Sequence, residues 1–235
     1  MHIFYCIQIQ NNEAELDQDE SRHLNKVLRV QVGEQVLVTD GKGFIYIAKV
    51  VNSDPKKAIL QIISKSDIYT KRSYYIHIAV APTKNIDRIE WFVEKAVEFG
   101  IDEISFIKTD RSERKNINLD RLNRIAISAM KQSLKGELVK INDLIAFSKF
   151  VKNVPEHFNK FVGHLDETKK LSLMSATKKD VSNLVLIGPE GDFSDSELEL
   201  SFQNGFKSIT LGDYRLRTET AALAACHILN LVNQI

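Results

Sequence analysis

Cysteine is scarce in this 235-residue chain, which has only Cys6 and Cys226. Two cysteines so far apart fit no metal-ligand spacing and suggest no disulfide framework. Long hydrophobic runs are missing too, since no apolar stretch approaches the roughly 20 residues of a membrane-spanning helix. The first residues also carry no basic segment ahead of a long apolar one. These absences predict a reduced, cytoplasmic protein that has no metal site and no membrane anchor.

A large net charge is also absent, but the charges are unevenly distributed along the chain. The formal charge is +1 overall. Between Lys108 and Lys140, nine Lys or Arg outnumber four Asp or Glu, whereas from Asn183 to Ile235 there are three against seven. This asymmetry is compatible with a basic face for a phosphate backbone beside a more neutral ligand pocket. A solvated, salt-bridged helix surface would explain it equally well.

The first 70 residues predict a small β-rich domain. Apolar alternation and short apolar runs indicate strands at Ile3–Gln10, Val36–Thr39, Phe44–Val51 and Ala58–Ile63. The turn at Asp40–Gly43, which contains two glycines, predicts a hairpin between the second and third of these strands.

The segment Ser21–Val30 predicts a helix between the first two strands, with Leu24, Val27 and Leu28 on its apolar face. Three basic residues fall together on the other side: Arg22, Lys26 and Arg29. A sheet that carries a basic helix is a plausible module for docking RNA.

From residue 71 onward the pattern changes to alternating strands and helices, which is typical of βα units around a parallel sheet. Strands are predicted at Tyr74–Ala81, Ile104–Ile107, Phe158–His164, Asn183–Ile187 and Phe206–Leu211. Helices are predicted at residues 86–99, which end before Gly100, and at Leu119–Leu134. The sequence therefore indicates two domains, residues 1–70 and 71–235.

Two glycine-bearing loops, Ile187–Gly191 and Leu211–Ala221, each follow a predicted strand and lead into a predicted helix. Glycine allows close approach of the backbone to a ligand, and the free amides at a helix start supply hydrogen-bond donors. The first loop alone could equally be a rigid connection, because Ser194–Glu197 reads as a capping box that starts the next helix. No GxGxxG motif follows a strand, so the pair does not indicate a dinucleotide fold.

The helix after the second loop, in which Thr218 is the predicted N-cap, is apolar on nearly every side. Such a helix must be buried, either in the core of its own domain or against a second subunit.

Together, these loops resemble the SPOUT class of RNA methyltransferases, and within it the RsmE family, which methylates a uridine of small-subunit ribosomal RNA at N3. The segment His23–Arg29 matches the HLxxVLR signature of the PUA-like barrel that begins these proteins. The resemblance extends over essentially the whole chain. It implies an α/β protein with a PUA-like RNA-binding β-barrel at 1–70 and a SPOUT domain at 71–235. A deep trefoil knot around the parallel sheet would hold the cofactor site, at about 160–225.

The resemblance also implies a homodimer that binds S-adenosylmethionine without a metal and acts on 16S rRNA within the small ribosomal subunit. The cofactor pocket would be lined by Ile187, Gly188, Glu190, Gly191, Leu211, Gly212, Leu216 and Thr218.

Methylation of a uracil nitrogen requires alignment of the base with the methyl group and removal of the N3 proton. Arg217 is our candidate for stabilising the developing anion, as an oxyanion hole does. Glu219 or Glu190 could assist proton removal, although a carboxylate at a helix start is also what simple capping selects. For RNA contact, Arg111 and Arg114 join the three basic residues of the first domain.

The chain departs from the family pattern at several positions. Asp192 stands where the family often has the second glycine of GPEGG. Tyr214 occupies the arginine position of LGxRxLRTET, and Arg215 follows one place later. Lys131 and Lys135 flank a segment that in many members reads EQSxR.

Two other functions remain open at this point. One is a SPOUT enzyme that methylates a ribose 2′-oxygen or a tRNA base, against which the HLxxVLR-type module argues. The other is a non-catalytic rRNA-binding assembly protein, which would keep the basic surfaces but would not need intact cofactor loops.

Overall fold

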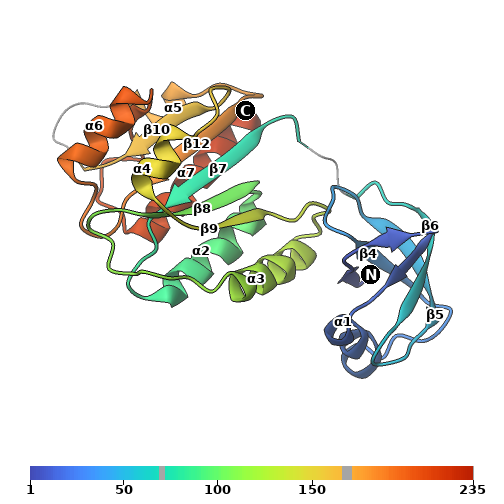
Figure 1. Ribbon diagram of the computed structural model, residues 1–235. Coiled ribbons are helices and arrows are strands. Elements are labelled where there is room, and N and C mark those ends of the chain that lie inside the picture. Colours follow the sequence, from blue (N-terminus) through green and yellow to red (C-terminus); the bar gives the residue numbers. More distant parts are fainter. Residues whose placement is uncertain (69–71, 166–170, 235) are drawn as a thin grey trace. The chain divides into compact units, whose positions relative to one another are not determined.

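The computed structural model describes residues 1–68, 72–165 and 171–234, which form two compact units (Figure 1). The first unit consists of Met1–Lys71 and Ile127–Leu138, and the second of Arg72–Ala126 and Val139–Ile235. The boundary predicted between residues 70 and 71 lies outside the described residues. The segment 127–138, which the sequence division places in the second domain, folds with the first unit.

The first unit is built on a six-stranded sheet in the order β1-β4-β5-β6-β3-β2. Its strands are β1 (Ile3–Tyr5), β2 (Ile9–Gln10), β3 (Glu13–Glu15), β4 (Gln35–Thr39), β5 (Tyr46–Asn52) and β6 (Ile59–Lys65). Only β1 and β4 pair in parallel, and the other pairs are antiparallel. Because side chains alternate along each strand, one face of this sheet closes a hydrophobic core that includes Phe4, Leu16, Leu24, Val38 and Leu60.

The turn between β4 and β5 explains why residues 127–138 belong to this unit. Gly41 has a φ of +73°, and a Cβ added there would lie 2.9 Å from the Cβ of Leu138. The Gly41 carbonyl accepts a hydrogen bond from the Leu138 amide at 2.9 Å, and the Gly43 amide donates to the Gly136 carbonyl at 2.8 Å. The hairpin is therefore completed by a segment almost one hundred residues later in the chain.

The helix predicted at Ser21–Val30 is shorter and differently wound. It consists of α1 (Gln18–Arg22) followed by η1 (His23–Val27), a π-helical turn in which the Leu28 amide donates to the His23 carbonyl at 2.9 Å. The wider turn breaks the 3.6-residue period on which the prediction rested. Val27 is consequently 66% exposed, and its predicted place on the apolar face is wrong.

The basic residues of this segment are all on the surface. Arg22, Lys26 and Arg29 are exposed, and none of them forms an ion pair with another described residue. Their charges are therefore available to a polyanion.

The second unit contains a seven-stranded, fully parallel sheet in the order β11-β13-β10-β12-β7-β8-β9. Its strands are β7 (Tyr75–Val80), β8 (Glu103–Lys108), β9 (Lys140–Ala146), β10 (Asn159–Gly163), β11 (Leu171–Ser172), β12 (Ser182–Ile187) and β13 (Lys207–Thr210). Its helices are α2 (Ile86–Phe99), α3 (Leu119–Gln132, whose last turns belong to the first unit), α4 (Phe147–Lys152), α5 (Leu173–Ala176), α6 (Asp195–Gln203) and α7 (Thr218–Gln234). The predicted parallel α/β sheet is confirmed. The knotted threading stays a prediction.

Helices cover both faces of this sheet (Figure 1). The helix α7 packs on β7 and β12 and against α2, whereas α4 packs on β8 and β9 and against α6. Gly100 ends α2 with a φ of +96°, and Ser194 and Glu197 form the expected capping box at the start of α6. Among the helices of the described residues, none has the length and apolarity needed to cross a bilayer.

A buried polar network lies where β7 and β8 begin, at the opposite end of the strands from the loops described below. His77 shares a hydrogen bond with Ser105 at 2.8 Å, and Glu103 accepts from Tyr75 at 2.9 Å and from Asn142 at 2.6 Å. Burial lowers the pKa of His77 to about 4, so the ring is neutral at neutral pH.

Glu103 in the same network favours its charged form, whereas His77 favours its neutral form. Burial alone would raise its pKa, but attraction to His77 in its protonated form and hydrogen bonds from Lys140, Asn142 and Tyr75 outweigh burial and lower it below the usual value. Because the neutral form of His77 and the charged form of Glu103 are the favoured ones, the network is suited to neutral rather than acidic pH.

Candidate functional site

A pocket of about 490 Å³ opens where three neighbouring strands of the second unit end. The loops after β10, β12 and β13 form its walls, and ligands of open α/β sheets bind at this carboxyl end of the strands. Seven of the eight predicted cofactor residues line it: Ile187, Gly188, Glu190, Leu211, Gly212, Leu216 and Thr218.

The first predicted loop follows β12 and is tightly packed. A Cβ added to Gly188 would lie 3.2 Å from two ring atoms of Phe193 and 3.3 Å from its backbone nitrogen. This spacing leaves room for glycine and little else. Gly191, the eighth predicted cofactor residue, does not line the pocket and instead packs against Arg111.

The second predicted loop follows β13. Gly212 has a φ of +142°, a conformation that favours glycine. Its carbonyl and its amide both form hydrogen bonds with the Thr210 hydroxyl. The hydroxyl donates to the Gly212 carbonyl at 2.8 Å and accepts from the Gly212 amide at 3.2 Å. Leu211 and Leu216 are half-buried against the pocket.

One buried hydrogen bond joins the two loops. The Thr218 hydroxyl, in a residue only 5% exposed, donates to the Gly188 carbonyl at 3.0 Å. Thr218 is therefore the first residue of α7 rather than its N-cap, and the carbonyl of Arg217 accepts the first helical bond, from the Ala221 amide at 2.7 Å. The Thr218 hydroxyl thus links two walls of the pocket.

We expect Thr218→Val to lower the free energy of unfolding by about 1–3 kcal/mol, because the Gly188 carbonyl then loses a buried donor. Chemical denaturation measures the loss. Thr218→Ser keeps the hydroxyl and should stay close to the parent protein. Equal destabilisation by serine and valine would show that packing of the threonine methyl, not the hydrogen bond, is what matters.

The third wall, Gly163–Leu165 after β10, carries no motif and was not singled out from the sequence. The carboxylate of Asp192 holds it, because Oδ2 accepts a hydrogen bond from the Leu165 amide at 2.8 Å. Oδ1 accepts another from the Phe193 amide at 2.8 Å. Only the fold brings Asp192 and Leu165 together, so sequence spacing could not have indicated this wall.

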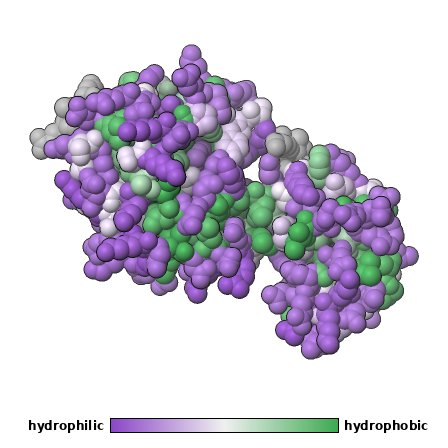
Figure 2. All heavy atoms as spheres, in the orientation of Figure 1, coloured by the Kyte–Doolittle hydropathy of each residue, from purple (hydrophilic) through white to green (hydrophobic). Residues whose placement is uncertain are grey.

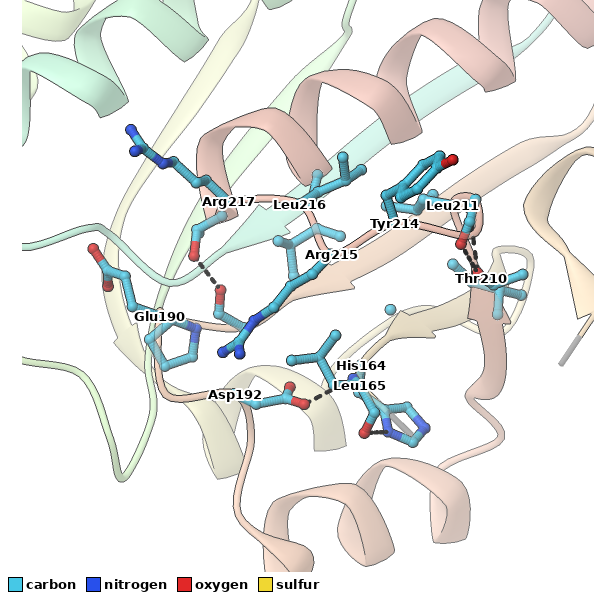
Figure 3. Close-up of a pocket in the computed structure, with 18 of the residues that line it drawn as sticks. His164, Leu165, Glu190, Asp192, Thr210, Leu211, Tyr214, Arg215, Leu216 and Arg217 are labelled. Atoms are coloured by element: carbon cyan, nitrogen blue, oxygen red, sulfur yellow. Dashed lines mark hydrogen bonds between the residues drawn. The ribbon is translucent and has the colours of Figure 1, made fainter. Parts of the chain in front are cut away.

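Charged side chains of both signs surround the pocket (Figure 3). Arg215 extends across the pocket towards Asp192, whereas the guanidinium of Arg217 points away from both of them. Tyr214, in the position where the family has an arginine, is 88% exposed. Glu190 is also exposed, and its Oε1 accepts a hydrogen bond from the Lys84 amide at 3.4 Å.

A second pocket, of about 590 Å³, adjoins the first and shares Arg88 and Arg215–Arg217 with it. Glu219 lines only this second pocket. Glu219 is only 6% exposed, and its Oε1 lies 3.8 Å from Nε of Arg88. Its Oε2 is buried, and no described residue donates a hydrogen bond to it. Trp91, which is 43% exposed, lines the same pocket. The predicted catalytic residues, Arg217 and Glu219, thus both line the second pocket, which lies beside the pocket that the predicted cofactor residues line.

Two of the predicted RNA contacts have a structural role that the sequence did not reveal. Nη1 of Arg111 donates to the carbonyls of Gly191 and Phe193, at 2.6 and 3.2 Å. Arg114 donates through Nε to the Thr83 carbonyl at 3.0 Å, and through Nη2 to the Lys84 carbonyl at 2.5 Å. Both arginines therefore stabilise the loops around the site. Within the part of the chain that the structure describes, no group of His, Cys, Asp and Glu could hold a metal ion.

Comparison with known proteins gives consistent results. A family described as "RNA methyltransferase domain" matches residues 70–230, and one described as "RNA methyltransferase PUA domain" matches residues 16–63. Ribosomal RNA small subunit methyltransferase E of Rickettsia conorii is 30% identical over 225 residues, covering 92% of this chain and 88% of that protein. The protein of the same name from Aquifex aeolicus is 29% identical and covers 97% and 99%.

Solved structures extend the similarity to the fold. A probable rRNA-methyltransferase from Porphyromonas gingivalis superposes with a TM-score of 0.91 at 37% identity, covering 100% of this chain and 99% of that one. A ribosomal RNA small subunit methyltransferase E from Neisseria gonorrhoeae, solved bound to S-adenosyl methionine, has a TM-score of 0.89 at 26% identity, with coverage of 99% and 98%.

Proposed function

The chain belongs to the ribosomal RNA small subunit methyltransferase E family, and on that premise we propose that it transfers a methyl group from S-adenosylmethionine to N3 of a uridine in 16S rRNA. The observation that carries this proposal is the 490 Å³ pocket closed by the Thr218–Gly188 hydrogen bond. Two of its three walls come from the loops that match the family motifs.

The pocket fits the adenosyl part of this cofactor in both size and character. Its volume lies within the range of small-molecule sites. Gly188 lines the pocket, and Ile187, Leu211 and Leu216 supply apolar walls for a flat ring. These residues would hold the nucleoside. When bound, the cofactor supplies a methyl group already activated by its sulfonium, so the protein needs neither a metal nor a covalent nucleophile.

The second pocket would then receive the uracil base. Trp91 offers an exposed aromatic surface on which a base can stack. Arg217, which lines both pockets, is positioned to stabilise negative charge that develops on the uracil oxygens. The unpartnered Oε2 of Glu219 could accept the N3 proton. Glu190 is the weaker candidate because it is exposed and already bonded to a backbone amide.

RNA would be held mainly by the first unit, which carries the match to the PUA domain. Arg22, Lys26 and Arg29 are exposed there, and each phosphate that a basic side chain neutralises adds affinity through counterion release. Arg111 and Arg114 remain proposed contacts, since each guanidinium keeps donors that no described residue accepts.

We propose a homodimer that covers the outer faces of α2 and α7. Phe99 on α2 is 43% exposed, and α7 leaves Leu223, Leu231 and Val232 only half-buried. Figure 2 shows apolar residues gathered at the surface where Figure 1 draws α2. A second copy would bury this surface. A small ribosomal subunit as substrate would place the protein in the cytoplasm.

Mass-spectrometric nucleoside analysis tests the proposal. Small ribosomal subunits that lack native uridine methylation are incubated with the protein and S-adenosylmethionine. We expect new 3-methyluridine in 16S rRNA, and none when the cofactor is left out. A different methylated nucleoside would leave a SPOUT enzyme with another target, such as a ribose 2′-oxygen. No methylation of subunits or free rRNA by folded protein would favour a non-catalytic assembly role.

A further inference from the structure

Two of the residues that depart from the family pattern, Asp192 and Arg215, lie in different loops of the chain but line the same pocket. Asp192 follows β12, and Arg215 follows β13. Figure 3 shows the Arg215 side chain reaching across the pocket towards Asp192. The structure thus places an anion, where the family often has a glycine, opposite a cation one place after the family's arginine position.

The carboxylate of Asp192 is held in a fixed orientation. Its two oxygens accept separate hydrogen bonds, from the Leu165 and Phe193 amides. The backbone of Asp192 has a φ of +60°, a left-handed conformation that aspartate adopts more readily than most residues with a Cβ. Each carboxylate oxygen can accept a second hydrogen bond. The anchored group therefore keeps acceptor sites on the pocket side.

Arg215, by contrast, is exposed and forms no ion pair with any described residue. Its guanidinium stays more than 4.0 Å from the Asp192 carboxylate, so the two groups do not pair directly. Two opposite charges that face each other across a gap, without forming an ion pair, suit a zwitterionic ligand whose own two charges can pair with them.

We propose that Asp192 and Arg215 form a subsite for the zwitterionic amino-acid end of S-adenosylmethionine. The proposal rests on the function proposed above. The Asp192 carboxylate accepts hydrogen bonds from the α-ammonium group, and the Arg215 guanidinium donates to the α-carboxylate, a pairing that its planar fork favours. The backbone-lined part of the pocket is left for the nucleoside.

The test compares two probes that share the adenosine and thioether groups. S-adenosylhomocysteine carries the amino-acid end, and 5′-methylthioadenosine lacks it. Their dissociation constants are measured by calorimetry for the parent protein, Arg215→Met and Asp192→Asn. Asparagine is chosen because it tolerates a positive φ. Arg124→Met, which removes an exposed arginine of α3 away from the pocket, controls for net charge.

We expect Arg215→Met to weaken S-adenosylhomocysteine binding roughly 10-fold and to leave methylthioadenosine binding within about twofold. Asp192→Asn also removes the acceptor of one backbone amide in the pocket wall, so it should weaken both probes, and S-adenosylhomocysteine more than methylthioadenosine. Arg215→Lys should recover part of the loss, and Arg124→Met should change neither constant. Equal weakening of both probes would mean that the pair only shapes the loops, and no weakening of either would also overturn the proposal. If the folded parent protein binds neither probe, the proposed function itself fails.

Discussion

Arg217→Ala is expected to lower the rate of methyl transfer at least about 100-fold while leaving cofactor affinity within a few-fold. Removal of a single donor that stabilises transition-state charge typically has an effect of about 10²–10³. Arg217 lines both pockets, and its side chain points away from the wall formed by Arg215 and Asp192. This orientation supports the proposed role of Arg217 at the RNA base rather than at the cofactor.

Single-turnover methylation at saturating cofactor measures the rate, and calorimetry with S-adenosylhomocysteine measures the affinity. Arg217→Lys keeps the charge but loses the planar fork, so its rate should fall between the rates of the parent protein and Arg217→Ala. Arg124→Ala removes an exposed arginine elsewhere in the second unit and serves as the matched control. A rate unchanged in Arg217→Ala, or a loss of rate matched by a loss of affinity, would contradict the catalytic role.

Acidification from pH 6.5 to pH 4 is expected to lower the free energy of unfolding of the second unit by about 3 kcal/mol through His77 alone. The pKa of His77 is lowered from 6.5 to about 4, chiefly by burial. Between these values the unfolded chain binds a proton that the folded chain excludes, so stability rises with pH in this window and is lost as the pH falls through it. A difference of one between the folded and unfolded pKa values corresponds to about 1.4 kcal/mol.

Glu103 acts in the same direction at lower pH, because its lowered pKa contributes stability that disappears as the carboxylate is protonated. Chemical denaturation at a series of pH values, compared between the parent protein and His77→Gln, isolates the contribution of the histidine. His157→Gln, which removes an exposed histidine, is the control. An identical pH dependence in His77→Gln and the parent protein would refute the expectation.

Local sequence signals predicted the parts of the fold that depend on neighbouring residues. The strand–helix alternation indicated the parallel sheet, Gly100 ended α2, and Ser194 with Glu197 began α6. The edge strand β9 was missed because Lys140–Ala146 is only half-buried and mixes polar with apolar residues. A strand with one exposed face and an irregular pattern resembles a loop in sequence.

The candidate site could be predicted in outline but not in detail. Seven of eight predicted cofactor residues line one pocket, because the two motifs follow β12 and β13, the strands on either side of β10. The role of Arg111 in holding the first loop was not predictable, since its partners Gly191 and Phe193 are about eighty residues away. The separation of Glu219 from the first pocket likewise depends on where α7 begins, one residue from the predicted position.

The bond between the Gly41 hairpin and residues 136–138 has a consequence during protein synthesis. Gly136 and Leu138 complete the hydrogen bonding of the turn between β4 and β5, so the first unit gains its full set of contacts only after its amino-terminal segment has left the ribosome. At about 5–20 residues per second, a delay of several seconds separates the two events. Throughout that interval, all six strands of the first unit have been synthesised, but the turn between β4 and β5 still lacks the hydrogen bonds that Gly136 and Leu138 supply.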